Sequence, residues 1–185
     1  MFITLETPRL IIRDHIVSDL QSHHELLSNK KVMYYLPELA TDTIEESEEN
    51  LQIAISEIDS FDRKYYFLRI EEKFNKEFVG EIGYTVDEVT PFGKLVSVGY
   101  FIHEKFWGRG YISEAIAELI RFAFENDNVF RISCGCLKEN AGSEKVMIKS
   151  CMIKEAEFKQ KVLHDGILKD RVEYRLLKSE WKKQA

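Results

Sequence analysis

Residues Val96–Ala117 have the sequence VSVGYFIHEKFWGRGYISEAIA, in which a predicted strand runs into a predicted helix. The connection contains Gly108 and Gly110, and two glycines allow the backbone to bend tightly with its N–H groups facing inward. The helix expected to begin at Tyr111 adds the positive end of its dipole. Together these features predict an anion site suited to a diphosphate.

Two basic side chains lie in the same loop. Lys105 and Arg109 can add charge-assisted contacts to a bound phosphate. The chain lacks the Gly-Lys-Ser/Thr of a P-loop. A dinucleotide fingerprint would need an acidic residue about 20 positions on, and Arg131–Leu137 offers only Arg131 as a charge. Spacing alone leaves a strand–turn–helix corner with an incidental glycine pair as an equal alternative.

Upstream of this loop, the patterns predict one strand and two helices. Arg9–Arg13 is typical of a short strand. Ser18–Gln21 and Thr43–Glu46 each have capping-box spacing, so we expect one helix through about Leu27 and another beginning at Thr43. The second helix has its apolar positions roughly on one face, at Ile44, Leu51, Ala54, Ile55 and Ile58.

Three strands are expected in the centre of the chain. Tyr65–Ile70 and Phe78–Val86 are rich in aromatic and β-branched residues, and the charged connection between them predicts an antiparallel pair. Leu95–His103 is the third strand, and it leads into the glycine loop.

The last part of the chain alternates between helix and strand. A helical period from Tyr111 to about Asn126 predicts one apolar stripe, made of Ile112, Ala115, Ile116, Leu119 and Ala123. A strand at Val129–Leu137 and a helix at about Gly142–Ser150 follow, and Asp165-Gly166 predicts a terminal hairpin. The order β-α-α-β-β-β-α-β-α-β-β indicates a mixed α/β sheet rather than a doubly wound parallel one.

Composition favours one globular domain over residues 1–185. Of these residues 44% are hydrophobic and 12% aromatic, and no internal repeat or linker divides them. The formal charge of −6 argues against a nucleic-acid partner. The start of the chain lacks a signal-peptide pattern, and no apolar run reaches the roughly 20 residues of a membrane helix. We therefore expect a cytoplasmic protein with no membrane partner.

The cysteines indicate reduced thiols rather than a disulfide framework. There are three of them, and an odd number of cysteines cannot all be paired in disulfides within one chain. Cys134 and Cys136 lie two apart on one face of a predicted strand, and core packing is the expected role of both. Two thiolates without a nearby pair of His or Cys do not make a zinc site, so we expect no metal.

The chain resembles the GNAT superfamily of N-acetyltransferases, and more narrowly the branch that contains the ribosomal-protein N-terminal acetyltransferases. The family signature has a basic or Gln residue, two residues, Gly, one residue, then Gly or Ala, and it falls on Lys105, Gly108 and Gly110. Further similarities cover nearly the whole chain in order, at Thr7–Leu10, Gly99–Ile102, Phe106–Tyr111, Glu114-Ala115, Asn140–Ser143, Asp170–Tyr174 and Leu176–Trp181.

This resemblance implies a GNAT fold, with a central, mostly antiparallel, splayed sheet flanked by helices. It also implies acetyl-CoA as cosubstrate, with its pantetheine arm lying along the strand before the loop like an added strand. Backbone groups of residues 101–103 would contact pantetheine, and residues 108–111 would hold the diphosphate. The implied cofactor-binding residues are Phe101, Ile102, His103, Lys105, Gly108, Arg109, Gly110, Tyr111, Asn140 and Ser143.

The family mechanism is direct attack of a neutral amine on the thioester. Many members have a tyrosine seven residues after the helix asparagine, where this chain has Met147, so Ser143 is the candidate acid, with helix capping as its alternative role. The branch often has a glutamate where this chain has Ser97. Glu81 is therefore the candidate base, against the alternative of a solvated strand residue, and His103 is a further candidate. The family's usual Gly-Phe after the last helix is replaced by Cys151-Met152.

The resulting hypothesis is an N-acetyltransferase that moves an acetyl group from acetyl-CoA to a primary amine. A protein N-terminus is favoured as the acceptor, and polyamines and aminoglycoside-like amines remain open. The alternative from another class is a non-catalytic acyl-CoA-binding regulatory module, which Met147 and Ser97 keep open. Monomer and homodimer are both open.

Overall fold

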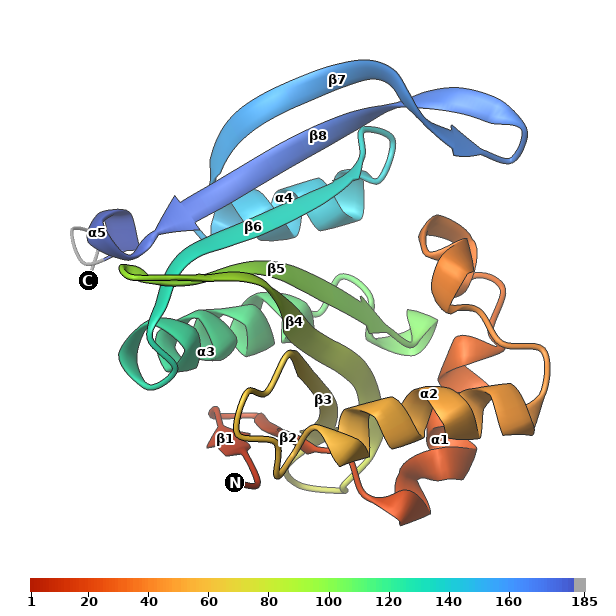
Figure 1. The fold of residues 1–185 in the computed structure, drawn as a ribbon. Coiled ribbons are helices and arrows are strands. Elements are labelled where there is room, and N and C mark those ends of the chain that lie inside the picture. The colour runs from red at the N-terminus through yellow and green to blue at the C-terminus, as the bar shows by residue number, and fades with distance from the viewer. Residues whose placement is uncertain (182–185) are drawn as a thin grey trace. The chain divides into compact units, whose positions relative to one another are not determined.

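The computed structural model describes residues 1–181, which are drawn in colour in Figure 1. These residues form two compact units. The first unit contains Met1–Val86 and Gly99–Leu119, and the second contains Asp87–Val98 and the described residues from Ile120 onward. A single domain over residues 1–185 stays a prediction, and residues 182–185 lie outside the described part of the chain.

Four antiparallel strands form the sheet of the first unit, and two of them match the predicted pair. Registered partners include Leu5 with Ile12, Ile12 with Ile70, and Leu68 with Ile82. These apolar side chains are all buried, which explains why the register is well defined. The strands are β1 (Thr4–Glu6), β2 (Leu10–Asp14), β3 (Tyr65–Glu72) and β4 (Phe78–Thr90).

Helices α1 (Leu20–Leu27) and α2 (Ile44–Ser56) lie side by side in the first unit (Figure 1). The capping box of α2 is confirmed, because Thr43 Oγ1 accepts from Glu46 N and Glu46 Oε2 accepts from Thr43 N, both at 3.3 Å. Of the apolar positions predicted to share one face of α2, Leu51 and Ala54 are buried, and Ile44 is exposed.

The capping box predicted at Ser18–Gln21 is wrong. Residues Val17–Asp19 form a one-turn 3-10 helix, and α1 begins at Leu20. The side chain that caps the start of this 3-10 helix is Asp19, whose Oδ2 accepts from Ile16 N at 2.9 Å. A buried carboxylate is a stronger acceptor than a serine hydroxyl, and here Arg13 also holds it in place.

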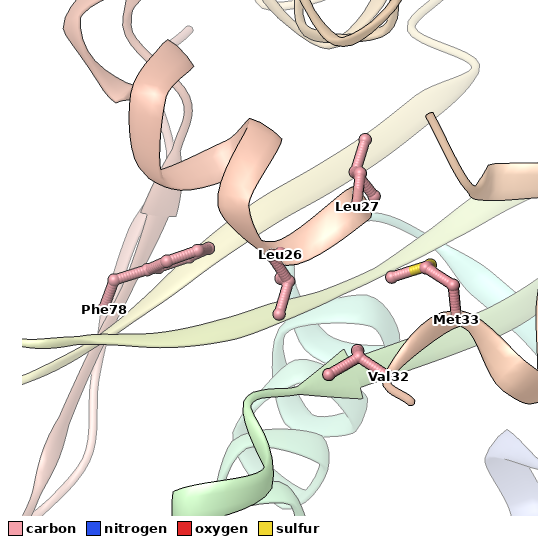
Figure 2. Close-up of a cluster of buried hydrophobic side chains, with 5 residues drawn as sticks. All are labelled: Leu26, Leu27, Val32, Met33 and Phe78. Carbon is pink, nitrogen blue, oxygen red and sulfur yellow. The ribbon is translucent and has the colours of Figure 1, made fainter. Parts of the chain in front are cut away.

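A cluster of apolar side chains joins α1, the segment after it and β4. Figure 2 shows the five buried members, Leu26, Leu27, Val32, Met33 and Phe78. The partly buried side chains of Leu36, Leu39 and Phe101 pack against this cluster. The end of the predicted cofactor strand therefore rests on the core of the first unit.

The second unit contains the parallel pairing of the fold and the terminal hairpin. Residues Lys94–Ser97 of β5 (Gly93–Ile102) pair in parallel with β6 (Val129–Leu137), which in turn pairs antiparallel with β8 (Ile167–Leu177). Strand β7 (Ile153–His164) pairs with β8 across Asp165 (φ 50°) and Gly166 (φ 73°). Two positive φ values identify a type I′ turn, so the predicted hairpin is confirmed.

Three helices complete the chain. Helix α3 (Tyr111–Glu125) has residues in both units, and all five members of its predicted apolar stripe are buried. Helix α4 (Ala141–Lys149) follows β6, and α5 (Lys178–Trp181) ends the described chain. In the second unit, the rings of Phe124 and Trp181 lie 5.5 Å apart between centroids.

The predicted fold class is confirmed. The eight strands are hydrogen-bonded in the order β1-β2-β3-β4-β5-β6-β8-β7. Of the registered pairs, only β5 with β6 is parallel. The predicted element order holds, with the short strand β1 added before it and the short helix α5 added after it.

Candidate functional site

The loop between β5 and α3 bends at its two glycines. After a one-turn 3-10 helix at Glu104–Phe106, Gly108 (φ 74°) and Gly110 (φ 78°) adopt the left-handed backbone that favours glycine. Glu114 N donates to Gly110 O at 3.0 Å, so α3 begins directly after the second glycine. The first N–H groups of a helix lack intrahelical acceptors. The loop therefore has a backbone geometry suited to an anion.

Arg9 fastens this loop to the first turn of α3. Its Nη1 donates to Arg109 O at 3.1 Å, and its Nε donates to Glu114 Oε2 at 2.6 Å. Glu114 Oε1 also accepts from Thr7 Oγ1 at 2.5 Å. The guanidinium carbon of Arg9 lies 4.5 Å from the ring centroid of Tyr111. These contacts hold the middle of the glycine segment and the first turn of the helix that follows it.

The basic side chains predicted to bind phosphate are exposed, and one of them already has an acidic neighbour. Lys105 Nζ lies 2.5 Å from Glu77 Oε1. The hydrogen bond and charge of Lys105 hold the pKa of Glu77 below its ordinary value. A phosphate would compete with Glu77 for Lys105. Arg109 lies with its guanidinium carbon 5.9 Å from the ring centroid of Phe106.

Tyr111 is buried and anchors the start of α3. Its hydroxyl donates to the carboxylate of Glu72, and this hydrogen bond raises the pKa of Tyr111 above its ordinary value. The side chain thus belongs to the packing of the first unit. The backbone N–H of Tyr111 is the group that remains suited to the predicted diphosphate role.

The end of β5 approaches β4 closely at Gly80. A Cβ on Gly80 would lie 2.4 Å from Phe101 O and 2.5 Å from the Cα of Ile102, so only glycine fits there. His103 N donates to Val79 O at 3.0 Å. Of the three residues predicted to offer backbone groups to pantetheine, His103 therefore already uses its N–H.

The side chains of residues 102–107 close on this strand end. Trp107 Nε1 donates to Ile102 O at 2.9 Å. The half-buried ring of His103 meets the ring of Phe78 edge-on, with 5.4 Å between centroids. Burial, helped by the charge of Lys105, lowers the pKa of His103 below its ordinary value. The imidazole is therefore mostly neutral at neutral pH.

Glu81, the candidate base, is not a solvated strand residue. It is 6% exposed, and its Oε1 lies 2.5 Å from His23 Nδ1 and 3.6 Å from His15 Nε2. Burial by itself would raise the pKa of Glu81. The charges of the two histidines, the hydrogen bond with His23 and the charge of Arg69 outweigh it, so this pKa lies below its ordinary value.

The second unit holds the other two predicted site residues, at the start of α4. Asn140 Oδ1 accepts from Ser143 N at 3.1 Å, so Asn140 is the N-cap of this helix. Ser143 is half-buried in the first turn. Burial raises the pKa of Cys136, and a hydrogen bond with Ser143 offsets this only in part. The capping role that we weighed for Ser143 thus falls to Asn140.

The departures from the family pattern have structural explanations. Met147 is fully buried in α4 and contributes to the core. Ser97 is exposed, and its Oγ donates to Asp87 Oδ2 at 2.6 Å. At the end of α4, Cys151 adopts a positive φ of 59° and is exposed, while Met152 is 5% exposed. The position after α4 thus has the left-handed backbone that glycine favours.

Two residues that contact the candidate site, Arg9 and His23, were not predicted as site residues from the sequence. The sequence patterns place Arg9 only in a predicted strand and in a family motif, and they give no role to His23. Their partners, Glu114 and Glu81, lie 105 and 58 positions away. No spacing rule connects side chains over such separations. Strand register and helix packing bring them together.

Comparison with known proteins agrees with this arrangement. A family model described as "Acetyltransferase (GNAT) domain" matches residues 9–152, which include the glycine loop and the start of α4. The chain belongs to the GNAT acetyltransferase family. It is an N-acetyltransferase by family, and the resemblance noted in the sequence is confirmed.

Relatives of this GNAT protein differ in what their names say. An uncharacterized N-acetyltransferase, YoaA of Bacillus subtilis, is 28% identical over 183 residues, covering 96% of this chain and 98% of the relative. The ribosomal-protein-serine acetyltransferase of Escherichia coli is 29% identical over 84 residues, covering 45% and 46% of the two chains. A crystal structure of spermidine N-acetyltransferase from Vibrio cholerae, in complex with CoA and spermine, has a TM-score of 0.81 and 19% identity. It covers 95% of this chain and 99% of that one.

Within residues 1–181, no helix has both the length and the apolar character needed to cross a bilayer.

Proposed function

We propose that this GNAT protein transfers an acetyl group from acetyl-CoA to a primary amine in the cytoplasm. The observation that carries the proposal is the loop before α3, where Gly108 and Gly110 have positive φ and Arg9 holds the backbone at Arg109. This is a preformed anion cradle of the kind a diphosphate needs. The spermidine acetyltransferase structure named above contains CoA, a cofactor with a diphosphate, which supports the proposal.

The proposed cofactor contacts follow the family resemblance. Residues 101–103 offer backbone groups to pantetheine, and the loop with Lys105 and Arg109 takes the diphosphate. The registered β5–β6 pairs cover Lys94–Ser97, while β5 continues to Ile102, so the last part of this strand lies beyond that register. In the second unit, the Asn140 amide would bond the pantetheine arm.

The proposed chemistry is attack of the amine nitrogen on the thioester carbon, which forms a C–N bond and breaks the C–S bond through a tetrahedral intermediate. Ser143, in the first turn of α4, would donate its hydroxyl proton to the departing thiolate. The positive end of the helix favours negative charge at that position. The backbone N–H of Ile102 would stabilise the oxyanion.

Glu81 is the proposed proton acceptor for the amine. A free alkyl ammonium has a pKa near 10, so complete transfer to a carboxylate before attack would cost roughly 8 kcal/mol. The N–H becomes much more acidic once the C–N bond forms. Proton transfer to Glu81, directly or through water, should therefore accompany bond formation rather than precede it.

Free-thiol release from acetyl-CoA tests the proposal. The panel of acceptors contains peptides with free N-termini, polyamines and aminoglycosides, and each active acceptor is repeated with Ser143→Ala and Glu81→Gln. We expect turnover with one amine class and a loss of about 100-fold or more with either variant. The active class then identifies the acceptor, and a peptide N-terminus is the one we favour.

The two failures of this test differ in meaning. Acetyl-CoA binding by calorimetry without turnover on the whole panel would favour the non-catalytic binding module. Absence of acetyl-CoA binding would contradict the proposed function itself. Sedimentation in the same buffer separates the monomer from the homodimer.

A further inference from the structure

A buried histidine on α1 faces the proposed base on β4. His23 is 2% exposed, its Nδ1 lies 2.5 Å from Glu81 Oε1, and its Nε2 lies 3.1 Å from Asn50 Oδ1. Each ring nitrogen thus faces an acceptor oxygen. A neutral imidazole has only one N–H, so both contacts are hydrogen bonds only when the ring is an imidazolium. The geometry therefore describes a buried ion pair between His23 and Glu81.

The charges around this pair support the same assignment. Two arginines neutralise two other carboxylates beside it: Arg13 contacts Asp19 at 2.8 Å and Glu71 at 2.6 Å, and Arg69 contacts Glu71 at 2.6 Å. Arg69 also lies 3.6 Å from Asp19. With these four charges balanced, the carboxylate of Glu81 is left to His23.

The remaining titratable neighbours do not replace His23 in this role. His15 is fully buried, and its ring nitrogens lie 3.6 Å from Asp19 Oδ2 and 3.6 Å from Glu81 Oε1, so neither nitrogen makes a hydrogen bond. His103, at the end of β5, has a lowered pKa and little positive charge at neutral pH. Of these three histidines, only His23 is within hydrogen-bond distance of both Glu81 and a second acceptor.

A metal ion is the competing explanation for these side chains. One ligand atom from each of His15, His23 and Glu81 lies within 4.8 Å of the others. However, two ligands of a tetrahedral zinc ion, with bonds near 2.1 Å, lie about 3.3 Å apart. The 2.5 Å between His23 Nδ1 and Glu81 Oε1 is a charge-assisted hydrogen-bond distance. The distance between His23 Nδ1 and Glu81 Oε1 therefore fits a shared proton better than a metal ion.

We propose that His23 is a positioning residue for Glu81, whose imidazolium fixes the carboxylate and keeps it ionised in a buried site so that it can accept the proton of the acceptor amine. The proposal rests on the role of Glu81 put forward above. It gives a residue of α1 a part in the reaction. The other proposed residues lie on the sheet, on helix α4 and in the loop that precedes α3.

The direction of the effect follows from the two opposing influences on Glu81. Burial favours the protonated acid, and the positive charge of His23 favours the carboxylate. Removing that charge leaves burial opposed by less, so the pKa of Glu81 must rise. The protonated acid cannot accept a proton, and activity should then be lost first at low pH.

His23→Asn tests this without removing the hydrogen bond. The asparagine amide can donate from about the position of Nδ1 but carries no charge. We expect the acid limb of the kcat/KM profile to move up by one pH unit or more. Well below the wild-type acid limb, activity would then fall about tenfold more than it falls at pH 8.5. The KM for acetyl-CoA should stay unchanged.

His24→Asn is the matched control. His24 is the next residue on α1, is half-buried, and has its own hydrogen bond from Nδ1 to Ser47 Oγ at 2.8 Å. It lies outside the pair, so its variant should keep the wild-type pH profile. Loss of a purely structural side chain lowers activity by the same factor at every pH. An equal loss at every pH in His23→Asn, or an acid limb that does not move, would therefore overturn the proposal.

A second measurement is independent of turnover and of the variant at His23. NMR titration of labelled histidines should give a pKa of His23 above its ordinary value in the wild type, and a lower pKa in Glu81→Gln, where burial is no longer outweighed. An identical titration in both proteins would overturn the ion pair. So would bound zinc at one equivalent that is lost in His15→Ala. Coupled titration without turnover on any amine would instead overturn the proposed function, and with it the catalytic use of the pair.

Discussion

Arg9 and Glu114 lie 105 positions apart and form an ion pair, with 2.6 Å between Nε and Oε2. The same guanidinium donates to the carbonyl of Arg109. The residue that follows the first proline of the chain thus supports the loop proposed to bind the diphosphate. Thr7 and Arg9 of the opening motif thus both contact Glu114 of α3.

Arg9→Ala should therefore weaken acetyl-CoA binding more than it weakens the fold. The ion pair is partly exposed, so we expect a loss of no more than about 1 kcal/mol in the free energy of unfolding. The freed loop should raise the KM for acetyl-CoA about tenfold, while the KM for the amine stays similar. Arg121→Ala is the control, because Arg121 pairs with Glu125 on the same helix at 2.9 Å. Equal effects of both variants on the KM would contradict the supporting role.

Gly108→Ala should combine a backbone cost with a binding defect. A Cβ on Gly108 would meet no atom within 4 Å, so the cost comes only from φ 74° and is about 1–2 kcal/mol. Gly166→Ala is a close match, with φ 73° and equally open space, but in the β7–β8 turn. Both variants should lower the midpoint of thermal unfolding to a similar extent. Only Gly108→Ala should raise the KM for acetyl-CoA, and a similar rise in Gly166→Ala would argue against the loop.

Substitutions of Asn140 should separate capping from cofactor binding. Serine caps a helix about as well as asparagine, whereas alanine costs about 1 kcal/mol. Asn140→Ala should therefore lower the stability, and Asn140→Ser should leave it nearly unchanged. Both should raise the KM for acetyl-CoA, because both lose the amide. A normal KM in Asn140→Ser would mean that this side chain serves only as the cap seen against Ser143 N.

Asp19 should make stability depend on acidic pH. Burial would raise its pKa, but the hydrogen bonds from Arg13 and from the backbone N–H of Ile16, together with the charge of Arg69, hold the pKa of Asp19 well below its usual range. A lowered pKa stabilises the fold above the unfolded-state value near 3.9, and this contribution fades as pH falls toward the folded value. Urea unfolding should show Asp19→Asn less stable than wild type at pH 6, with a difference that shrinks below about pH 4. The exposed Asp62→Asn should show no such trend, and a difference constant with pH would contradict the assignment.

Local features of the fold were predictable because their partners lie within a few residues. The capping box of Thr43 and Glu46 and the turn at Asp165-Gly166 follow from backbone conformation and short-range hydrogen bonds. The cap at Ser18 failed for the opposite reason. The acceptor there is Asp19, and what holds it is an arginine on the preceding strand, β2.

The sequence by itself determined the element order, the buried stripe of α3 and the glycine bend, because each depends on periodicity or on the conformational freedom of one residue. Only the tertiary structure decided which charges meet. Glu81 looked like a solvated strand residue until α1 brought His23 against it across 58 positions. Such contacts depend on strand register and helix packing, and these are set by the burial of the whole core rather than by neighbours in the chain.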